Sequence, residues 1–235
     1  MTVRIVEYHD ENILLRGELY APAVPNGRAV LVVHEADGIG GNVRRRCARL
    51  AELGYAAFAA DLHGGGKVLE GDEMRRAVDA FLAEPERLRR RTAAGFDAML
   101  DLTGLDPRRT AAIGYCFGGT AVLELARWGS PVAAVLSFHG LLTTRHPAER
   151  GKVRAAVAAF TGALDPLVPA RDVAAFQEEM TAAEVDWQLS VYGTAWHSFT
   201  NEGVIGSSDS RMRYDPVADR LSWNSAIALI REMLA

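Results

Sequence analysis

The heptapeptide Ile-Gly-Tyr-Cys-Phe-Gly-Gly at residues 113–119 decides how this chain folds. It follows the apolar run 110–113 and precedes a segment whose apolar residues have helical spacing. A strand that turns sharply into a helix, with small residues around one reactive side chain, predicts a nucleophile elbow. Gly114 and Gly118 lack the Cβ atoms that would clash in so tight a turn. The elbow would present the thiol of Cys116 at a helix N-terminus, where the macrodipole favours a thiolate.

A plainer interpretation of the same stretch is an ordinary junction between a strand and a helix. Cys116 would then be a buried and inert thiol, which is the usual state of a free cysteine. The two interpretations differ in whether other polar side chains converge on the thiol.

Apolar runs of strand length recur on both sides of the elbow, and segments with helical spacing lie between most of them. The first two runs, separated by residues 9–12, are expected to form an antiparallel hairpin at a sheet edge. The others alternate with helices, which predicts one α/β domain over residues 1–235, with a mostly parallel twisted sheet of about eight strands and helices on both faces. The expected strands are 2–8, 13–20, 29–33, 55–60, 110–113, 132–138, 153–160 and 187–192. The expected helices are 42–53, 70–102 with an interruption near residues 84–85, 120–128, 170–182 and 216–234.

The composition argues against several classes of protein. A chain of 235 residues that is 49% hydrophobic and 24% charged can bury a large core. Its formal net charge of -4 gives no electrostatic reason to expect nucleic acid or an anionic membrane as partner. No apolar run approaches the roughly 20 residues of a membrane span, and the first ten residues contain no signal-peptide core. Two cysteines, Cys47 and Cys116, favour a reducing cytoplasm over a disulfide scaffold. Scattered histidines predict no metal site, and no cofactor is expected.

Four polar side chains follow directly after expected strands: Glu35, Cys116, Asp165 and His197. In a parallel sheet with helices on both faces, ligands bind beyond the carboxyl ends of the strands. We therefore expect these four side chains to share one site.

The order of three of these residues along the chain suggests a catalytic triad. A thiol attacks a carbonyl well when a base takes its proton and a third group orients the base. Cys116 as nucleophile, Asp165 as acid and His197 as base follow the order nucleophile, acid, histidine. Asp165 also fits a helix cap, and His197 also fits a surface loop. Five other histidines compete as the base, and His139 is the strongest because it also follows a strand: His9, His34, His63, His139 and His146.

The oxyanion of a tetrahedral intermediate needs backbone donors. The elbow supplies the N–H of Phe117, and the loop after residue 33 supplies a second one, that of Ala36. Glu35 in this loop has two interpretations. It is either a solvated carboxylate or an inward carboxylate that hydrogen-bonds the thiol and keeps it neutral until substrate arrives.

These motifs together resemble the dienelactone hydrolase family of α/β-hydrolases over nearly the whole chain. The resemblance rests on four stretches in the same order: residues 34–39, 114–119, 162–166 and 192–199. It implies an α/β-hydrolase fold, a triad of Cys116, His197 and Asp165, and a gating role for Glu35. We expect His63, His139, Trp196 and Phe199 near the substrate pocket.

The chain departs from this family at two positions. The best-known members open the lactone ring of dienelactones and hold the substrate carboxylate with two arginines. One arginine follows the strand that here ends at Asp61, where this chain has residues 63–66, His-Gly-Gly-Gly. The other lies four residues after the catalytic histidine, where this chain has Asn201. Four arginines elsewhere are candidates to replace that contact: Arg75, Arg76, Arg145 and Arg211.

The sequence thus favours a hydrolase of small carboxylic esters or lactones that forms an acyl-thioester, as a monomer or small homo-oligomer. The alternative is a non-hydrolytic thiol sensor or binding protein on the same fold. A third hypothesis is hydrolysis of peptides or thioesters by the same triad, but the sequence shows no peptide-binding feature that supports it.

Overall fold

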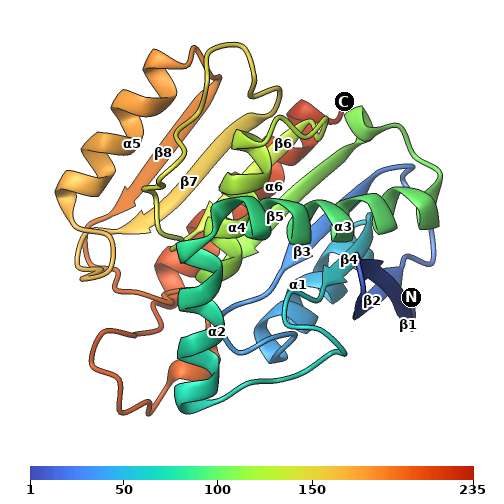
Figure 1. Cartoon of the computed structure of the whole chain (residues 1–235), viewed down its shortest axis with the longest axis horizontal. Coiled ribbons are helices and arrows are strands. Elements are labelled where there is room, and N and C mark those ends of the chain that lie inside the picture. The colour runs from blue at the N-terminus through green and yellow to red at the C-terminus, as the bar shows by residue number, and fades with distance from the viewer.

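A computed structural model describes all residues from 1 to 235. Eight strands form one sheet with the order β1-β2-β4-β3-β5-β6-β7-β8, and helices lie on both faces of it (Figure 1). The predicted fold class is confirmed. The strands are β1 (Thr2–Asp10), β2 (Ile13–Ala21), β3 (Ala29–Val33), β4 (Ala56–Ala60), β5 (Thr110–Tyr115), β6 (Ala134–Phe138), β7 (Ala156–Gly162) and β8 (Trp187–Tyr192). The helices are α1 (Gly41–Glu52), α2 (Gly71–Ala83), α3 (Pro85–Thr103), α4 (Phe117–Arg127), α5 (Ala170–Ala182) and α6 (Pro216–Met233), with 3-10 turns at Pro107–Arg109 and Glu202–Val204.

The strands pair antiparallel at one end of the sheet and parallel in the rest of it. β1 pairs antiparallel with β2, and Asp10 faces Ile13 across a tight turn. β2 also pairs antiparallel with β4. From β4 to β8 every neighbouring pair is parallel. The loops that follow β3, β5, β6, β7 and β8 therefore emerge at the same edge, where the expected site residues lie.

Two apolar layers sandwich the sheet. The central strand β3 is fully buried, and its side chains alternate between the layers because successive residues of a strand point to opposite faces. Leu31 and Val33 pack in the layer formed with α3, α4 and α5. Val30 and Val32 pack in the layer formed with α1 and α6. Figure 1 shows α3 and α4 crossing one face, with α1 and α6 behind the sheet.

The interruption expected near residues 84–85 is confirmed: α2 ends at Ala83, and Pro85 begins α3 as its first residue, where a missing N–H is tolerated. Other boundaries differ from those expected. β7 begins at Ala156, three residues later than expected. α4 begins at Phe117, three residues earlier than the apolar pattern alone suggests. β6 begins only at Ala134, because Val132 is buried by packing and not by strand pairing.

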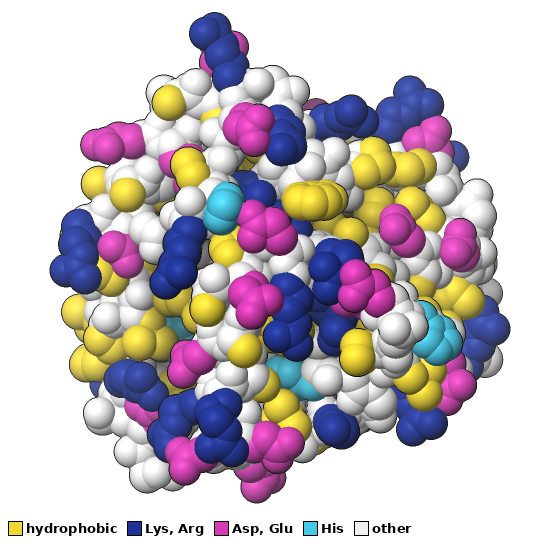
Figure 2. Space-filling view, in the orientation of Figure 1, with side chains coloured by type: hydrophobic (Ala, Val, Ile, Leu, Met, Phe, Trp, Pro, Cys, Tyr) yellow, Lys and Arg dark blue, Asp and Glu magenta, His cyan; other side chains and the backbone are white.

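Basic and acidic side chains are interspersed over the face seen in Figure 2. None of the helices combines the length and the apolar character needed to cross a bilayer.

Candidate active site

The turn from β5 into α4 holds Cys116 in an unusual backbone conformation, with φ 54° and ψ -119°. Two glycines make this turn possible. A Cβ on Gly114 would lie 2.0 Å from the carbonyl oxygen of Gly118, and a Cβ on Gly118 would lie 2.3 Å from that of Val33. Both obstacles are backbone atoms that cannot move aside. The elbow expected from the sequence is therefore present, with Cys116 at the N-cap of α4.

Three side chains from separate loops form a continuous chain of contacts at this turn. Nε2 of His197 lies 3.1 Å from Sγ of Cys116, and Nδ1 of His197 lies 2.8 Å from Oδ2 of Asp165. Asp165 and His197 are buried, each 3% exposed, whereas Cys116 is partly accessible. The thiol can thus meet a solute while its two partners are shielded from water.

The charges of this trio are linked. Burial by itself lowers the pKa of His197, but the negative Cys116 sulfur and the hydrogen bonds to Asp165 and Cys116 raise that pKa to about 10. A buried imidazolium is stable only beside such partners. The arrangement therefore favours the protonated form of His197.

Asp165 does not cap the following helix. α5 begins at Ala170 with Pro169 as its N-cap. Oδ1 of Asp165 instead accepts the N–H of Leu167, 2.8 Å away, and this bond fixes the carboxylate with its other oxygen toward His197.

The two expected oxyanion donors lie beside the thiol. Phe117 is the first residue of α4, so its N–H has no acceptor within the helix. The N–H of Ala36 donates to no protein acceptor. Both residues line the cavity that contains Cys116. The carbonyl of Ala36 is held by Nε2 of His63 at 2.8 Å, and the His63 ring stacks on Phe117.

Glu35 is buried but makes no hydrogen bond to the thiol. Its Oε2 accepts from the amide of Asn201 at 2.8 Å, and its Oε1 accepts from the amide of Asn42 at 3.4 Å. Burial is the main cause that raises the pKa of Glu35, to about 7. The solvated interpretation of Glu35 is thus wrong, and its partners in this structure are two amides and not Cys116. Asn201, at the position where the resemblance noted in the sequence implies an arginine, holds this carboxylate.

His139, the main rival base, faces the backbone of Cys116 and not its sulfur. Nδ1 of His139 accepts the N–H of Cys116 at 3.1 Å, so the ring proton must be on Nε2, which lies 2.8 Å from Oγ1 of Thr200. Burial, the positive charge of His197 and that of Arg46 lower the pKa of His139 well below its ordinary value. A neutral ring with both nitrogens engaged cannot accept the proton of the thiol.

The remaining histidines lie away from Sγ. His34 is buried and accepts the N–H of Leu62 through Nε2. His9 is exposed on β1, and His146 is exposed and pairs with Glu86.

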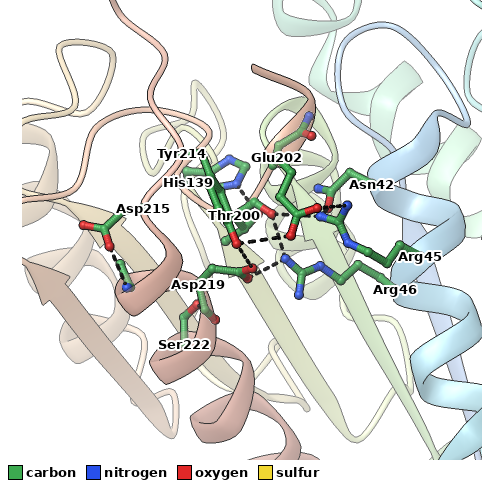
Figure 3. Close-up of polar contacts among 12 residues, drawn as sticks. Asn42, Arg45, Arg46, His139, Thr200, Glu202, Tyr214, Asp215, Asp219 and Ser222 are labelled. Carbon is green, nitrogen blue, oxygen red and sulfur yellow. Dashed lines mark hydrogen bonds and ion pairs between the residues drawn. The ribbon is translucent and has the colours of Figure 1, made fainter. Parts of the chain in front are cut away.

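A buried polar network supports the loop that carries His197 (Figure 3). The sequence did not predict this network. Arg46 reaches from α1 and donates to the carbonyl of Thr200 at 2.7 Å and to Oδ1 of Asp219 at 2.5 Å. Its guanidinium also lies over the rings of Tyr115 and Trp223. In the sequence, Arg44-Arg45-Arg46 is typical of a solvated helix face. Only the position of Arg46 on the apolar face of the amphipathic helix α1 could have predicted that its side chain points inward.

The thiol opens into a cavity of about 760 Å³ between α1, α2 and the loops after β3, β6 and β8. Trp196 and Phe199, expected near the substrate, do not line it. Phe199 is fully buried, with its ring against those of His139 and Tyr192. His63 lies behind Ala36 and also lines no part of it. The expected residues that do line it are Glu35, Ala36, Cys116, Phe117, His139 and His197.

Three arginines line this cavity: Arg45, Arg75 and Arg211. Each forms an ion pair with a carboxylate of its own neighbourhood. Of the four candidates considered from the sequence, Arg76 and Arg145 do not line it. The three partners are Glu202 for Arg45, Asp72 for Arg75 and Asp209 for Arg211.

Comparison with known proteins places this geometry in a family. The model of the dienelactone hydrolase family matches residues 15–234. A curated relative from Aquifex aeolicus, named "Putative carboxymethylenebutenolidase", is 27% identical, and the match covers 98% of this chain and 99% of the relative. The solved structure of m3DLH is 35% identical with a TM-score of 0.94, covering 100% of this chain and 99% of that one.

A dienelactone hydrolase-like promiscuous phosphotriesterase, P91, from metagenomic libraries is 34% identical with a TM-score of 0.91, and 99% of this chain aligns with 98% of it. The family match, these relatives and the fold agree. This chain belongs to the dienelactone hydrolase family and is a dienelactone hydrolase-like hydrolase.

Proposed function

We propose that this chain hydrolyses carboxylic esters or lactones through an acyl-thioester at Cys116. The observation that carries the proposal is the unbroken chain of contacts from Asp165 through His197 to Sγ of Cys116, at 2.8 Å and 3.1 Å. Such a chain activates a nucleophile and keeps the base in one tautomer.

In the first half of the reaction, the Cys116 thiolate attacks the carbonyl carbon of the ester. The carbonyl oxygen becomes an oxyanion that the N–H groups of Phe117 and Ala36 stabilise. When the tetrahedral intermediate collapses, the carbon–oxygen bond to the alcohol breaks. The His197 imidazolium gives its proton to the departing alkoxide, and the acyl group stays on Sγ.

In the second half, neutral His197 takes a proton from a water molecule, and the hydroxide attacks the thioester carbonyl. Collapse of this intermediate breaks the carbon–sulfur bond and releases the acid. The thiolate and the imidazolium are thereby restored. Asp165 stays ionised throughout and orients the imidazole through its Nδ1–H.

Neutral substrates fit this cavity better than carboxylates do. The arginines at its walls each have a carboxylate partner, and the place of one family arginine is taken by Asn201, which binds Glu35. A substrate carboxylate would therefore have to displace an existing ion pair, whereas a neutral ester or lactone has no such requirement.

Turnover of a panel of p-nitrophenyl acetate, simple lactones, thioesters and short peptides, by wild type and by Cys116→Ala, tests this proposal. We expect the esters and lactones to be hydrolysed by wild type and not by the variant. A thiol sensor on the same fold would be alkylated at Cys116 but would turn over no member of the panel.

Phosphotriester hydrolysis is a second candidate activity, favoured by the likeness to P91 over 99% of the chain. The thiolate would attack phosphorus, the bond to the aryloxide would break, and water would then cleave the sulfur–phosphorus bond. A neutral triester needs no unpaired arginine. Release of p-nitrophenol from paraoxon, absent in Cys116→Ala, is the expected result.

A further inference from the structure

A second cavity, of about 230 Å³, lies beside the catalytic cavity and has no part in the chemistry described above. Leu82, Thr120 and Leu141 line both cavities. Thr120 stands one helical turn beyond the nucleophile on α4, and its Oγ1 accepts the N–H of Leu141 at 2.9 Å. This bond fixes the shared wall. We call the second cavity the side groove.

The walls of the side groove are mainly apolar, and the charge of its one carboxylate is neutralised. Its carboxylate, Glu124, is only 2% exposed and accepts from Arg89 at 2.7 Å and from Arg127 at 2.9 Å. A carboxylate engaged on both oxygens is not free to bind a cation or a polar group. The apolar walls are Phe81, Leu82, Pro85, Leu88 and Leu141, and the polar rim is Thr143, Thr144 and Arg145.

The position of the side groove relative to the triad selects which end of an ester can reach it. The ring of Phe117, whose N–H faces the oxyanion, packs on the groove wall Phe81 with centroids 5.7 Å apart. None of the groove-lining residues belongs to the loops that carry Asp165 and His197. Since His197 protonates the departing alkoxide, the alcohol lies on the His197 side, and the acyl chain extends toward the groove.

We propose that the side groove binds the unbranched apolar acyl chain of the ester substrate and sets the chain length that the enzyme prefers. This inference rests on the proposed ester hydrolysis at Cys116. The groove buries several methylene groups at most, which matches a chain of medium length and not a long fatty acid. Acetate, with no chain to bury, leaves the groove empty.

The test measures kcat/KM for p-nitrophenyl acetate, butyrate, hexanoate and octanoate. In wild type, kcat/KM rises from acetate to hexanoate by up to about fourfold for each methylene that is fully buried. Thr143→Trp fills the groove from its exposed rim, where the native side chain makes no hydrogen bond. The variant should keep acetate hydrolysis within about twofold and lose most of the gain with hexanoate.

Ser225→Trp is the matched control, because Ser225 is an exposed small residue that lines a separate groove between α6, β7 and β8. It should leave the whole series unchanged. Leu88→Ala makes the opposite change and should move the preferred length toward octanoate.

Three results would overturn the proposal. They are a flat series in wild type, an unchanged hexanoate-to-acetate ratio in Thr143→Trp, or a response to Thr143→Trp that appears only when the alcohol of an acetate ester is lengthened. Each leaves acetate turnover and its dependence on Cys116 intact. Acetate hydrolysis that persists in Cys116→Ala would instead contradict the proposed reaction itself.

Discussion

The backbone N–H of Cys116 donates to Nδ1 of His139, 3.1 Å away. The same N–H also lies 2.9 Å from the carbonyl oxygen of Phe138. One donor is thus shared by two acceptors at a residue whose φ of 54° lies in the region that side chains rarely adopt. His139 itself has a φ of 41°, and Thr200 holds the far side of its ring. These contacts make His139 a support for the elbow rather than its base.

Replacing His139 separates these two roles. Asn tolerates a positive φ and offers a carbonyl oxygen as acceptor, so His139→Asn should retain kcat/KM within about tenfold and keep the wild-type pH profile. His139→Leu loses the acceptor and is strained, and a misplaced nucleophile costs on the order of 10²-fold in rate. The measurement is kcat/KM against pH for both variants and for His197→Ala. Loss of activity in His139→Asn as complete as in His197→Ala would identify His139 as the base.

The elbow glycines should be intolerant of a single methyl group. Gly114→Ala places Cβ 2.0 Å from a backbone oxygen, so we expect a loss of about 3 kcal/mol in the free energy of unfolding. Gly193→Ala is the control, because nothing lies within 4 Å of its Cβ and its φ is not positive. It should change stability by less than about 1 kcal/mol. Urea denaturation of both variants measures the difference, and equal stabilities would show that the turn is less tight than described.

The alternation of apolar runs was enough to predict the sheet, because buried parallel strands read as continuous apolar segments. The ends of strands also brought Cys116, Asp165 and His197 to one edge, where the structure places them in contact. The hydrogen-bond partners of the other site residues were not predictable from the sequence. Whether Glu35 meets the thiol or Asn201 depends on the path of two loops and on side-chain rotamers, which no local pattern encodes.

The prediction that two aromatic residues line the pocket was wrong for a related reason. Trp196 and Phe199 flank His197 in sequence, but neighbouring residues of a loop point in different directions. Phe199 turns into the core behind His139, so closeness in sequence did not bring it to the cavity. The apolar character of Phe199 predicted that its side chain is buried, but it did not predict whether that side chain lines the cavity.

The raised pKa of Glu35 should make the stability of the fold depend on pH. Its ordinary value of 4.5 applies to the unfolded chain, and burial raises the native value to about 7. Between these values the unfolded chain loses the proton first, so this contribution is fully present below pH 4.5 and is lost as pH rises through 7. Relative to Glu35→Gln, the free energy of unfolding of wild type should fall by on the order of 3 kcal/mol over this range.

Urea denaturation of wild type and Glu35→Gln from pH 4 to 8 measures this difference. Glu52→Gln, at an exposed position on α1, controls for the loss of one negative charge and should run parallel to wild type. A constant difference between wild type and Glu35→Gln at every pH would mean that Glu35 ionises as an exposed carboxyl does.

The covalent intermediate tests the central claim most directly. Wild-type enzyme is mixed with excess p-nitrophenyl butyrate, quenched in acid within one turnover, and mapped by peptide mass spectrometry. We expect a butyryl group on Cys116, since in the proposed reaction its sulfur, 3.1 Å from Nε2 of His197, is the attacking atom, and no adduct on the matching peptide of Cys116→Ala. Turnover at the wild-type rate with Cys116 unmodified, or retained in Cys116→Ala, would contradict the account.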